Sequence, residues 1–392
     1  MLRLSKFASG VRASATLAAG AKARELRAQG AIIFDFSLGE PDQPTPAHIC
    51  RAAEAALAAG HTHYTPAGGI VELRKAVSNW YRSFHGWDVP IDRVVISNGA
   101  KHALHNALVA TVGPGDDVLI PDPCWVSYED LVMMTGATPV HVATTAESGF
   151  KLSAEQYRAA RTPKTRLILL NSPCNPTGTV YTRAELESLV DTILETDVAI
   201  LSDEIYEQLC YAPAKPTCIA ALRPEAAERT ITVSGASKSY AMTGWRAGWG
   251  IAPPHIAASM TAIQSQETGC PSSVSQYALL AALQGPQDCI GQMRQEYQAR
   301  RKIVCDRLSK IPGVKLHFPD GAFYAFFDVS QQIADKRLAN SAAFCVAALA
   351  EAHVNLVPGS AFNAEGYVRM SYATSRDQIE GGLAALEQWL GG

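Results

Sequence analysis

The sequence predicts an α/β protein. A large domain surrounds a mostly parallel, doubly wound sheet, and a smaller α+β domain is built from the N- and C-terminal segments. Three observations predict this architecture. Short apolar runs alternate with segments of helical period along most of the chain. These runs are apolar at nearly every position, which is typical of parallel strands covered by helices on both faces. A long helical stretch from about 286 to 311 then breaks the alternation.

The expected strands of the large sheet follow one another along the chain. They lie at 93–97, 117–120, 138–142, 166–170, 198–202, 230–234 and 247–251, with helices between most of them, for example at 101–112 and 183–195. After the long helix, three further strands at 323–327, 353–357 and 367–371 indicate the smaller domain. We therefore expect an N-terminal arm with part of the small domain (1–45), a large domain (46–285), and a connecting helix with the small C-terminal domain (286–392).

The composition of the 392 residues excludes several classes of protein. Lys and Arg number 34 against 37 Asp and Glu, and this net charge of −3 argues against a nucleic-acid-binding protein. Charged residues make up only 18% of the chain and hydrophobic ones 47%, so we expect a large core and apolar surface that a second subunit could cover. No apolar run approaches the roughly 18 residues that a membrane span requires. The nine scattered cysteines form no CxxC pair and indicate free thiols in a reducing cytoplasm.

The N-terminal segment needs a separate interpretation. The first 24 residues contain five basic residues and no acidic one, a composition shared with transit peptides. However, residues 13–17 continue without a break into the helical pattern of 22–29. We therefore interpret this segment as an arm of the folded protein and expect a cytoplasmic location.

In a doubly wound sheet, ligands bind beyond the carboxyl ends of the strands, and several of these ends carry unusual polar residues. Asn98-Gly-Ala-Lys101 is either an ordinary helix entry or an anion site made of bare backbone amides. Asn175 stands in a turn that two prolines make rigid, which suits the orientation of a small ligand. Asp203 ends a buried strand, where its carboxylate requires a cation from the protein or from a ligand.

The residues that follow the 230–234 strand give the most specific indication of a binding site. Lys238 stands among small residues, and a crowded, partly apolar pocket lowers the proton affinity of an amine and makes it a nucleophile. Arg246 follows eight residues later and can bind a phosphate with its planar guanidinium. Neither a Walker A nor a GxGxxG pattern is present, so a nucleotide cofactor is not supported.

These segments resemble the class I/II aminotransferases, which are pyridoxal-phosphate enzymes of fold type I, near the bacterial aspartate aminotransferase subgroup. The resemblance covers nearly the whole chain. It rests on Ser37-Leu-Gly-Glu-Pro-Asp42, Tyr64-Thr-Pro-Ala-Gly68, Asn175-Pro-Thr-Gly178, Ser202-Asp-Glu-Ile-Tyr206, the Lys238 segment and Val368-Arg-Met-Ser-Tyr-Ala-Thr374.

The resemblance implies a role for each catalytic candidate. Lys238 would hold pyridoxal 5'-phosphate as an internal aldimine and then move a proton between the substrate Cα and the cofactor. Asp203 would keep the pyridine nitrogen protonated, so that the ring accepts electrons. Asn175 and Tyr206 would bond to the phenolic oxygen of the cofactor, and Trp125 would stack on the ring.

The resemblance also implies two binding sets. The phosphate would be held by Gly99, Ala100, Lys101, Ser237, Arg246 and, from the neighbouring subunit of a homodimer, Tyr64. The α-carboxylate of the substrate would be held by Arg369, Gly39 and Asn175. Many relatives have a serine three residues before the lysine, where this chain has Gly235. Ser234 and Ser237 are the alternatives for the missing hydroxyl.

We therefore predict a homodimeric transaminase that moves an amino group from an L-amino acid to a 2-oxo acid such as 2-oxoglutarate. A C–S β-lyase or related lyase with the same cofactor is the alternative. A transcription regulator with an aminotransferase-like domain is not expected, because the 36 residues before Ser37 are too few for a DNA-binding region. No second cation for a distal carboxylate can be assigned from sequence, so aspartate-like, aromatic, alanine-like and broad donors stay open.

Two pairs of histidines have spacings that could suit a metal. They are His61 with His63 and His102 with His105. No carboxylate or cysteine completes a ligand set with either pair. We therefore interpret them as surface or supporting histidines and expect no metal.

Overall fold

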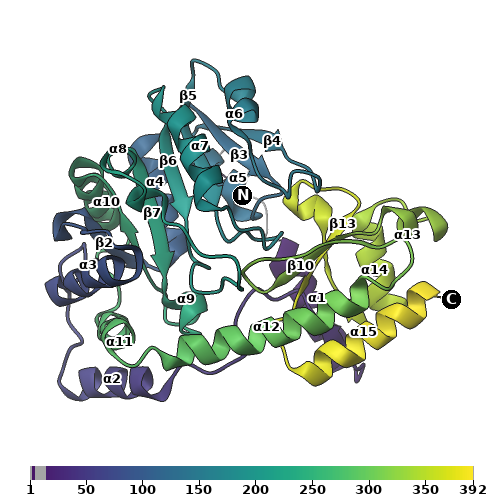
Figure 1. Cartoon of the computed structure of the whole chain (residues 1–392). Coiled ribbons are helices and arrows are strands. Elements are labelled where there is room, and N and C mark those ends of the chain that lie inside the picture. Colours follow the sequence, from purple (N-terminus) through teal and green to yellow (C-terminus); the bar gives the residue numbers. More distant parts are fainter. Residues whose placement is uncertain (1, 5–14, 392) are drawn as a thin grey trace.

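The computed structural model describes residues 2–4 and 15–391, which form two adjacent domains joined along a long helix (Figure 1). The part of the predicted N-terminal arm at residues 1 and 5–14 lies outside the described residues. Within the described ranges, no helix is long and apolar enough to cross a membrane.

The large domain contains a seven-stranded sheet in the order β2-β8-β7-β6-β5-β3-β4. All strands from β7 to β4 run parallel, and β8 is antiparallel to both of its neighbours. The sheet is therefore mostly parallel, as predicted. Its strands are β2 (Val94–Asn98), β3 (Asp117–Asp122), β4 (Thr138–Ala143), β5 (Thr165–Asn171), β6 (Ala199–Asp203), β7 (Thr230–Gly235) and β8 (Ala247–Ile251).

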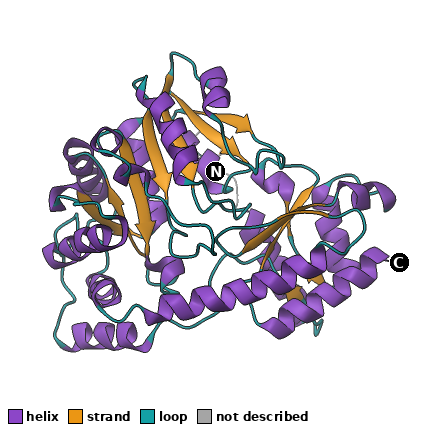
Figure 2. Ribbon diagram, viewed as in Figure 1, coloured by secondary structure: helices purple, strands orange, loops and turns teal. Residues whose placement is uncertain are grey.

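Helices cover both faces of this sheet (Figure 2), because successive apolar side chains of each strand point to opposite faces. Leu119 and Ile168 pack with α7 on one face, whereas Val118 and Leu169 pack with α4 and α5 on the other. The helices and 3-10 turns of this domain are α2 (Ala47–Ala58), α3 (Val71–His85), η2 (Ile91–Arg93), α4 (Ala100–Thr111), α5 (Ser127–Met134), α6 (Ala154–Ala160), α7 (Arg183–Leu194), η3 (Ile219–Ala221), α8 (Pro224–Ala227), α9 (Ala236–Ser239), α10 (Pro254–Glu267) and α11 (Ser273–Gln284).

The small domain combines segments from both ends of the described chain. Its antiparallel sheet has the order β12 (Val357–Pro358), β13 (Tyr367–Ser371), β10 (Tyr324–Asp328) and β9 (Lys315–His317). A parallel pair joins β1 (Phe34–Asp35) to β11 (Val354–Asn355). The prediction of one strand at 353–357 was wrong, because Leu356 separates β11 from β12. The helices and 3-10 turn are α1 (Ala15–Ala28), α13 (Ser330–Asp335), α14 (Ser341–Glu351), η4 (Gly359–Phe362) and α15 (Arg376–Gly391).

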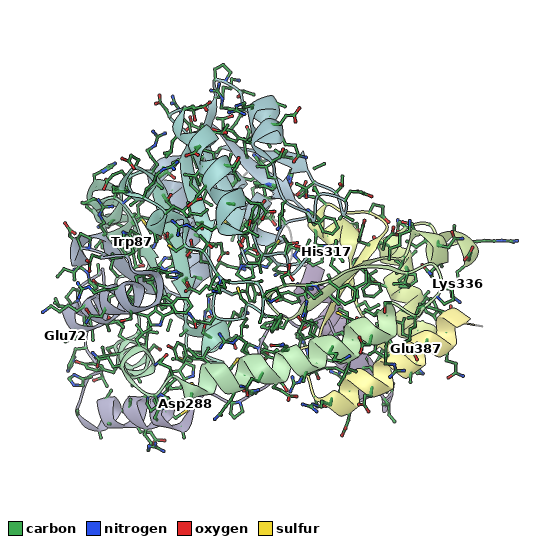
Figure 3. All side chains as sticks on the ribbon, viewed as in Figure 1. Glu72, Trp87, Asp288, His317, Lys336 and Glu387 are labelled. Atoms are coloured by element: carbon green, nitrogen blue, oxygen red, sulfur yellow. The ribbon has the colours of Figure 1, made fainter. Side chains whose placement is uncertain are left out.

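The connecting helix α12 (Asp288–Leu308) has 21 residues, so it is about 30 Å long and passes beneath both domains (Figure 1). Arg307 near its end forms an ion pair of 2.5 Å with Glu387 of α15, and Glu387 is labelled in Figure 3. A second contact joins the domains: His317 Nε2 lies 2.9 Å from Thr179 Oγ1. The two domains are therefore packed together rather than tethered.

Candidate active site

A cavity of about 570 Å³ opens at the carboxyl ends of the parallel strands, between the two domains. The large domain contributes Ala100, Lys101, Trp125, Asn175, Asp203 and Tyr206 to its wall, and also Ser237, Lys238 and Arg246. Gly39 and Arg369 come from the segments that build the small domain. Eleven of the thirteen predicted site residues thus line one cavity, and Gly99 and Tyr64 do not.

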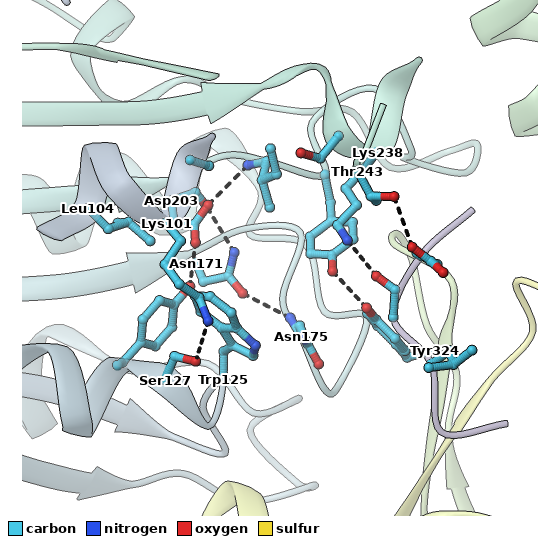
Figure 4. A pocket seen from close by; sticks show the side chains of 18 of the residues that line it. Lys101, Leu104, Trp125, Ser127, Asn171, Asn175, Asp203, Lys238, Thr243 and Tyr324 are labelled. Atoms are coloured by element: carbon cyan, nitrogen blue, oxygen red, sulfur yellow. Dashed lines mark hydrogen bonds between the residues drawn. The ribbon is translucent and has the colours of Figure 1, made fainter. Parts of the chain in front are cut away.

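Lys238 lies on α9, directly after strand β7. Its amine donates a hydrogen bond to the backbone oxygen of Gly39, which belongs to the small-domain side of the cavity (Figure 4). Burial lowers the pKa of Lys238 to about 8, and the positive charges of Arg369 and Arg246 act in the same direction against the opposing charge of Glu40. The amine of Lys238 therefore loses its proton more readily than that of an ordinary lysine, which makes it a better nucleophile.

Asp203 ends strand β6 and is almost fully buried. Its Oδ2 accepts a hydrogen bond of 2.7 Å from the hydroxyl of Tyr128, and its Oδ1 accepts one of 3.2 Å from the backbone of Ile205. Burial raises the pKa of Asp203 to about 6, and these two hydrogen bonds limit the rise. The carboxylate is therefore held ready for a positively charged partner from the cavity.

Sequence reasoning missed two tyrosines that support these groups. Tyr128, on α5, packs edge-to-face against Trp125, with the ring centroids 5.3 Å apart. Tyr324, on β10, has its hydroxyl 2.7 Å from that of Tyr206. The spacing of Tyr128, three residues after Trp125 at the start of a helix, was a signal that it shares the orientation of Trp125. No comparable signal marked Tyr324, which stands in an apolar strand.

One end of the cavity is built to accept an anion. Gly99 has φ +82°, and a Cβ atom there would lie only 2.5 Å from Nη2 of Arg246. Arg246 itself has φ +52°, an uncommon conformation for a residue other than glycine. Its guanidinium donates to the backbone oxygens of Thr243 (2.8 Å) and Asn98 (3.5 Å), and it forms no ion pair with any described residue. Arg246, which lies beside the start of α4, therefore has guanidinium N–H groups that could bind a phosphate.

Packing explains why a glycine rather than a serine stands at position 235. A Cβ atom at this position would lie 2.9 Å from the oxygen of Ala247 and 2.9 Å from Cα of Gly248, so no serine fits without a backbone shift. The hydroxyl of Ser234 donates to Glu207 at 2.8 Å and is used there. Ser237 lines the cavity. Of the two serines, therefore, only Ser237 is placed to serve a ligand in the cavity.

Arg369, on β13, is 1% exposed and lies between aromatic rings, 4.5 Å from the centroid of Tyr324 and 5.0 Å from that of Phe362. It donates to Asn175 Oδ1 (2.9 Å) and to the backbone oxygen of Ser37 (2.8 Å). Its Nε has no hydrogen-bond partner, and no described carboxylate pairs with it. Burial lowers its pKa. A buried, unpaired guanidinium at a cavity wall is suited to bind a carboxylate from a ligand.

Lys101 occupies the side of the cavity opposite Lys238 (Figure 4). Its amine donates to Ser127 Oγ at 3.1 Å and lies 4.7 Å from the ring centroid of Trp125. Burial, followed by the nearby charge of Arg246, lowers the pKa of Lys101. Lys101, which the resemblance assigned to the phosphate, thus lines the cavity as a further cation near Arg246.

The remaining predicted residues lie outside the cavity. Tyr64 is 94% exposed.

The interpretation of His102 and His105 was wrong in one respect, because a carboxylate does accompany them. Glu267 of α10 lies 3.4 Å from His102 Nε2 and 3.0 Å from His105 Nε2. This contact joins α4 to α10 across a sequence separation that no local pattern reveals.

The cavity fits pyridoxal phosphate on the chemistry of its donors. Arg246 and the bare start of α4 suit the phosphate, the buried carboxylate of Asp203 suits a protonated ring nitrogen, and the amine of Lys238 suits the carbonyl carbon. Trp125 lines the same cavity and is an aromatic side chain on which a ring could stack. The residues present thus match each functional group of this cofactor.

Comparisons with known proteins agree over the whole chain. The family model described as aminotransferase class I and II matches residues 31–386. The aspartate aminotransferase of Geobacillus stearothermophilus is 42% identical over 389 residues, which is 99% of each chain. The solved aspartate aminotransferase from Rhizobium meliloti is 39% identical with a TM-score of 0.94, covering 99% of this chain and 98% of that one. The Thermus thermophilus aspartate aminotransferase with maleate is 38% identical with a TM-score of 0.93, covering 99% of this chain and 100% of that one.

Proposed function

The chain belongs to the class I and II aminotransferases, and we propose that aspartate or a similar dicarboxylic L-amino acid is its amino donor and 2-oxoglutarate or a related 2-oxo acid its acceptor. It is a pyridoxal-phosphate-dependent transaminase. The lyase alternative is not favoured, because the relatives that span the whole chain are transaminases. The donor and the role of each residue are proposals.

When bound, pyridoxal phosphate supplies an electrophilic carbonyl and a ring that accepts electrons. The amine of Lys238 would hold the cofactor and would move the proton at the substrate Cα, a role that its lowered pKa of about 8 supports. Asp203 would hold a proton on the ring nitrogen, and the hydroxyl of Tyr128 would keep the Asp203 carboxylate ionised and oriented. Tyr206 and Asn175, which line the same cavity, would orient the phenolic oxygen, and Arg246 and Ser237 would hold the phosphate.

The observation that carries the amino-acid assignment is Arg369. Its guanidinium is buried, has no acidic partner among the described residues, and already has two of its donors directed to Asn175 and Ser37. A carboxylate from the substrate would supply the missing charge, and donor and acceptor both carry that carboxylate.

Lys101, which the resemblance assigned to the phosphate, is proposed instead to bind a second carboxylate in the substrate. It lines the same cavity as Arg369 and forms no ion pair with the described part of the chain. The relative from Thermus thermophilus was solved with maleate, which is a dicarboxylate. An amino acid held by Arg369 at its α-carboxylate and by Lys101 at its distal carboxylate would be aspartate-like.

We also propose a homodimer in which Tyr64 reaches the phosphate of the neighbouring subunit. Tyr64 is almost fully exposed in the single chain, although its ring is large and partly apolar, and burial against a second copy would remove this cost. We propose a cytoplasmic location as well, which is supported by the nine cysteines, all of them free thiols that persist best in a reducing compartment.

A donor screen tests this function. Aspartate, glutamate, alanine and phenylalanine are each mixed with the holoenzyme, and loss of the visible absorption of the bound cofactor is followed, with its recovery after addition of a 2-oxo acid. We expect aspartate to react fastest, with both phases present. Lys101→Ala should reduce kcat/KM for aspartate roughly 10- to 100-fold and that for alanine much less. Lys151→Ala, which removes a surface lysine paired with Glu185, is the matched control.

Equal losses for aspartate and alanine would contradict the role of Lys101 without affecting transamination. Release of ammonia and pyruvate without an acceptor would contradict transamination itself.

A further inference from the structure

Tyr324 joins the two domains inside the active-site cavity. It lies on β10 of the small domain, is fully buried, and lines the cavity. Its hydroxyl oxygen lies 2.7 Å from that of Tyr206 of the large domain (Figure 4). The two rings are nearly perpendicular, with their centroids 5.8 Å apart. The two residues are 118 positions apart in the sequence, so the packing of the domains creates this contact.

A hydrogen bond between two hydroxyl groups uses one hydrogen atom and leaves the other free. Each tyrosine hydroxyl has a single hydrogen to donate and can also accept a hydrogen bond. Neither hydroxyl has another hydrogen-bond partner in the part of the chain that the structure describes. The tyrosine that accepts therefore keeps its own hydrogen for a group in the cavity.

Arg369 makes Tyr324 the better donor of the two. The guanidinium carbon of Arg369 lies 4.5 Å from the ring centroid of Tyr324. Burial raises the pKa of Tyr324, and the positive charge of Arg369 opposes this rise. Burial raises the pKa of Tyr206 well above its usual value, even though Arg369 opposes this rise as well. The more acidic phenol donates more strongly, so the hydrogen between the two oxygens belongs to Tyr324.

Gly39 confines the Tyr324 hydroxyl from another side. A Cβ atom at Gly39 would lie only 2.7 Å from this oxygen, so a larger residue there would displace the hydroxyl. The backbone oxygen of Gly39 accepts the hydrogen bond from Lys238. The Tyr324 hydroxyl is therefore held between Tyr206 and the backbone segment that bonds to Lys238.

We propose that Tyr324 is a positioning residue, whose hydroxyl donates to the oxygen of Tyr206 and thereby directs the hydrogen of Tyr206 toward the phenolic oxygen of the cofactor. This inference rests on the role of Tyr206 in the proposed function. A hydroxyl that accepts a hydrogen bond becomes a stronger donor, because the two bonds polarise each other. The small domain thus strengthens a contact that the large domain makes with the cofactor.

The test follows the visible absorption of the bound cofactor as a function of pH, in the holoenzyme without substrate. A hydrogen bond to the phenolic oxygen stabilises the form of the cofactor that has lost a proton, because that form carries more negative charge at this oxygen. Loss of the bond therefore raises the midpoint of the pH transition. We expect Tyr206→Phe to raise the midpoint by roughly 1–2 pH units. Tyr324→Phe should raise it by a smaller amount, roughly 0.3–0.7 pH unit.

A double variant separates positioning from direct contact with the cofactor. In Tyr206→Phe the hydroxyl through which Tyr324 acts is absent, so the addition of Tyr324→Phe should not move the midpoint further. Tyr372→Phe is the matched control, because Tyr372 is equally buried and its hydroxyl bonds to the backbone oxygen of Ala322 at 3.4 Å. This control should leave the midpoint unchanged. The Tm of each variant is measured as well, since a merely structural loss would lower the Tm without moving the midpoint.

An unchanged midpoint in Tyr324→Phe, together with a raised one in Tyr206→Phe, would overturn this inference and leave the proposed function intact. An equal shift in Tyr372→Phe would overturn it too, because the effect would then be general. A further shift caused by Tyr324→Phe in the Tyr206→Phe background would mean that Tyr324 acts on the cofactor directly, which contradicts positioning. If Tyr206→Phe alone leaves the midpoint unchanged, the proposed role of Tyr206 fails, and the inference about Tyr324 fails with it.

Discussion

Replacing Tyr128 by phenylalanine removes one hydroxyl and tests how the charge of Asp203 is maintained. The Tyr128 hydroxyl donates at 2.7 Å to Oδ2 of Asp203, and among the described residues the other donor to this carboxylate is the backbone of Ile205 at 3.2 Å. A hydrogen bond to a charged group contributes about 1.5–3 kcal/mol. Since 1.36 kcal/mol corresponds to a factor of ten, kcat/KM should fall roughly 10- to 150-fold.

The same loss predicts a pH dependence. Without the Tyr128 hydroxyl, which lowers the pKa of Asp203, that pKa should rise further above about 6. The carboxyl group is protonated below its pKa. The pH range in which Asp203 loses its charge therefore moves toward neutral pH. Cofactor affinity in Tyr128→Phe should therefore be reduced more at pH 6.5 than at pH 8.5. Cofactor binding and kcat/KM are measured at both pH values.

A matched control and a double variant isolate the interaction. Tyr157 is equally buried, and its hydroxyl bonds to Thr196 far from the cavity, so Tyr157→Phe should leave kcat/KM unchanged. In an Asp203→Asn background, Tyr128→Phe should cost little more, because the charge that it supports is gone. A Tyr128→Phe enzyme within twofold of the parent would refute the reasoning, and so would equal losses in both backgrounds.

Three further predictions follow from the same structure. Lys238→Ala should lose transamination, and borohydride should attach the cofactor covalently to Lys238 in the parent, as peptide mass spectrometry would detect; a label on another lysine would contradict the assignment. Arg369→Ala should weaken transition-state binding of donor and acceptor by about 2–5 kcal/mol, and Arg369→Lys should still impair both in steady-state kinetics because it lacks the planar fork; an enzyme that accepts amines without a carboxylate equally well would exclude this role. Burial raises the pKa of Glu204 to about 7 and the charge of Glu207 adds to the effect, so stability falls as pH rises from about 4.5 to 7. Glu204→Gln should accordingly be more stable than the parent by about 1–3 kcal/mol at pH 8 and not at pH 4.5, as measured by urea unfolding; an equal difference at both pH values would contradict ionisation as the cause.

The large sheet could be predicted because its strands are buried on both faces. Each of the seven predicted strands overlaps an observed one, for example 166–170 with β5 and 230–234 with β7. Such strands are continuous apolar runs, and their polar carboxyl ends identified Asp203 and Lys238 without any knowledge of pairing. The short strands β1 and β9 were missed, because two or three residues carry no detectable alternation.

The supporting contacts could not be predicted, because they join residues that are distant in sequence. Tyr128 and Asp203 are 75 positions apart, and Tyr206 and Tyr324 are 118 apart. Likewise, the carboxylate that accompanies His105 comes from Glu267, 162 positions later. Only the folded sheet brings these elements together. Local sequence patterns can therefore identify the reactive side chains but not the residues that bond to them.

The pairing of β1 with β11 also determines when, during synthesis, this protein can first bind its substrate. Asn355 donates to Asp35 across 320 positions, so at about 5–20 residues per second the ribosome needs roughly 15–65 seconds between these two residues. All seven strands of the large sheet are synthesised before this pairing is possible. Ser37 and Gly39, which contact Arg369 and Lys238, follow β1 directly. A nascent chain can therefore complete its large sheet well before the substrate side of the cavity exists, and a pulse-labelling experiment would find reactivity toward amino acids appearing after the sheet has become resistant to protease.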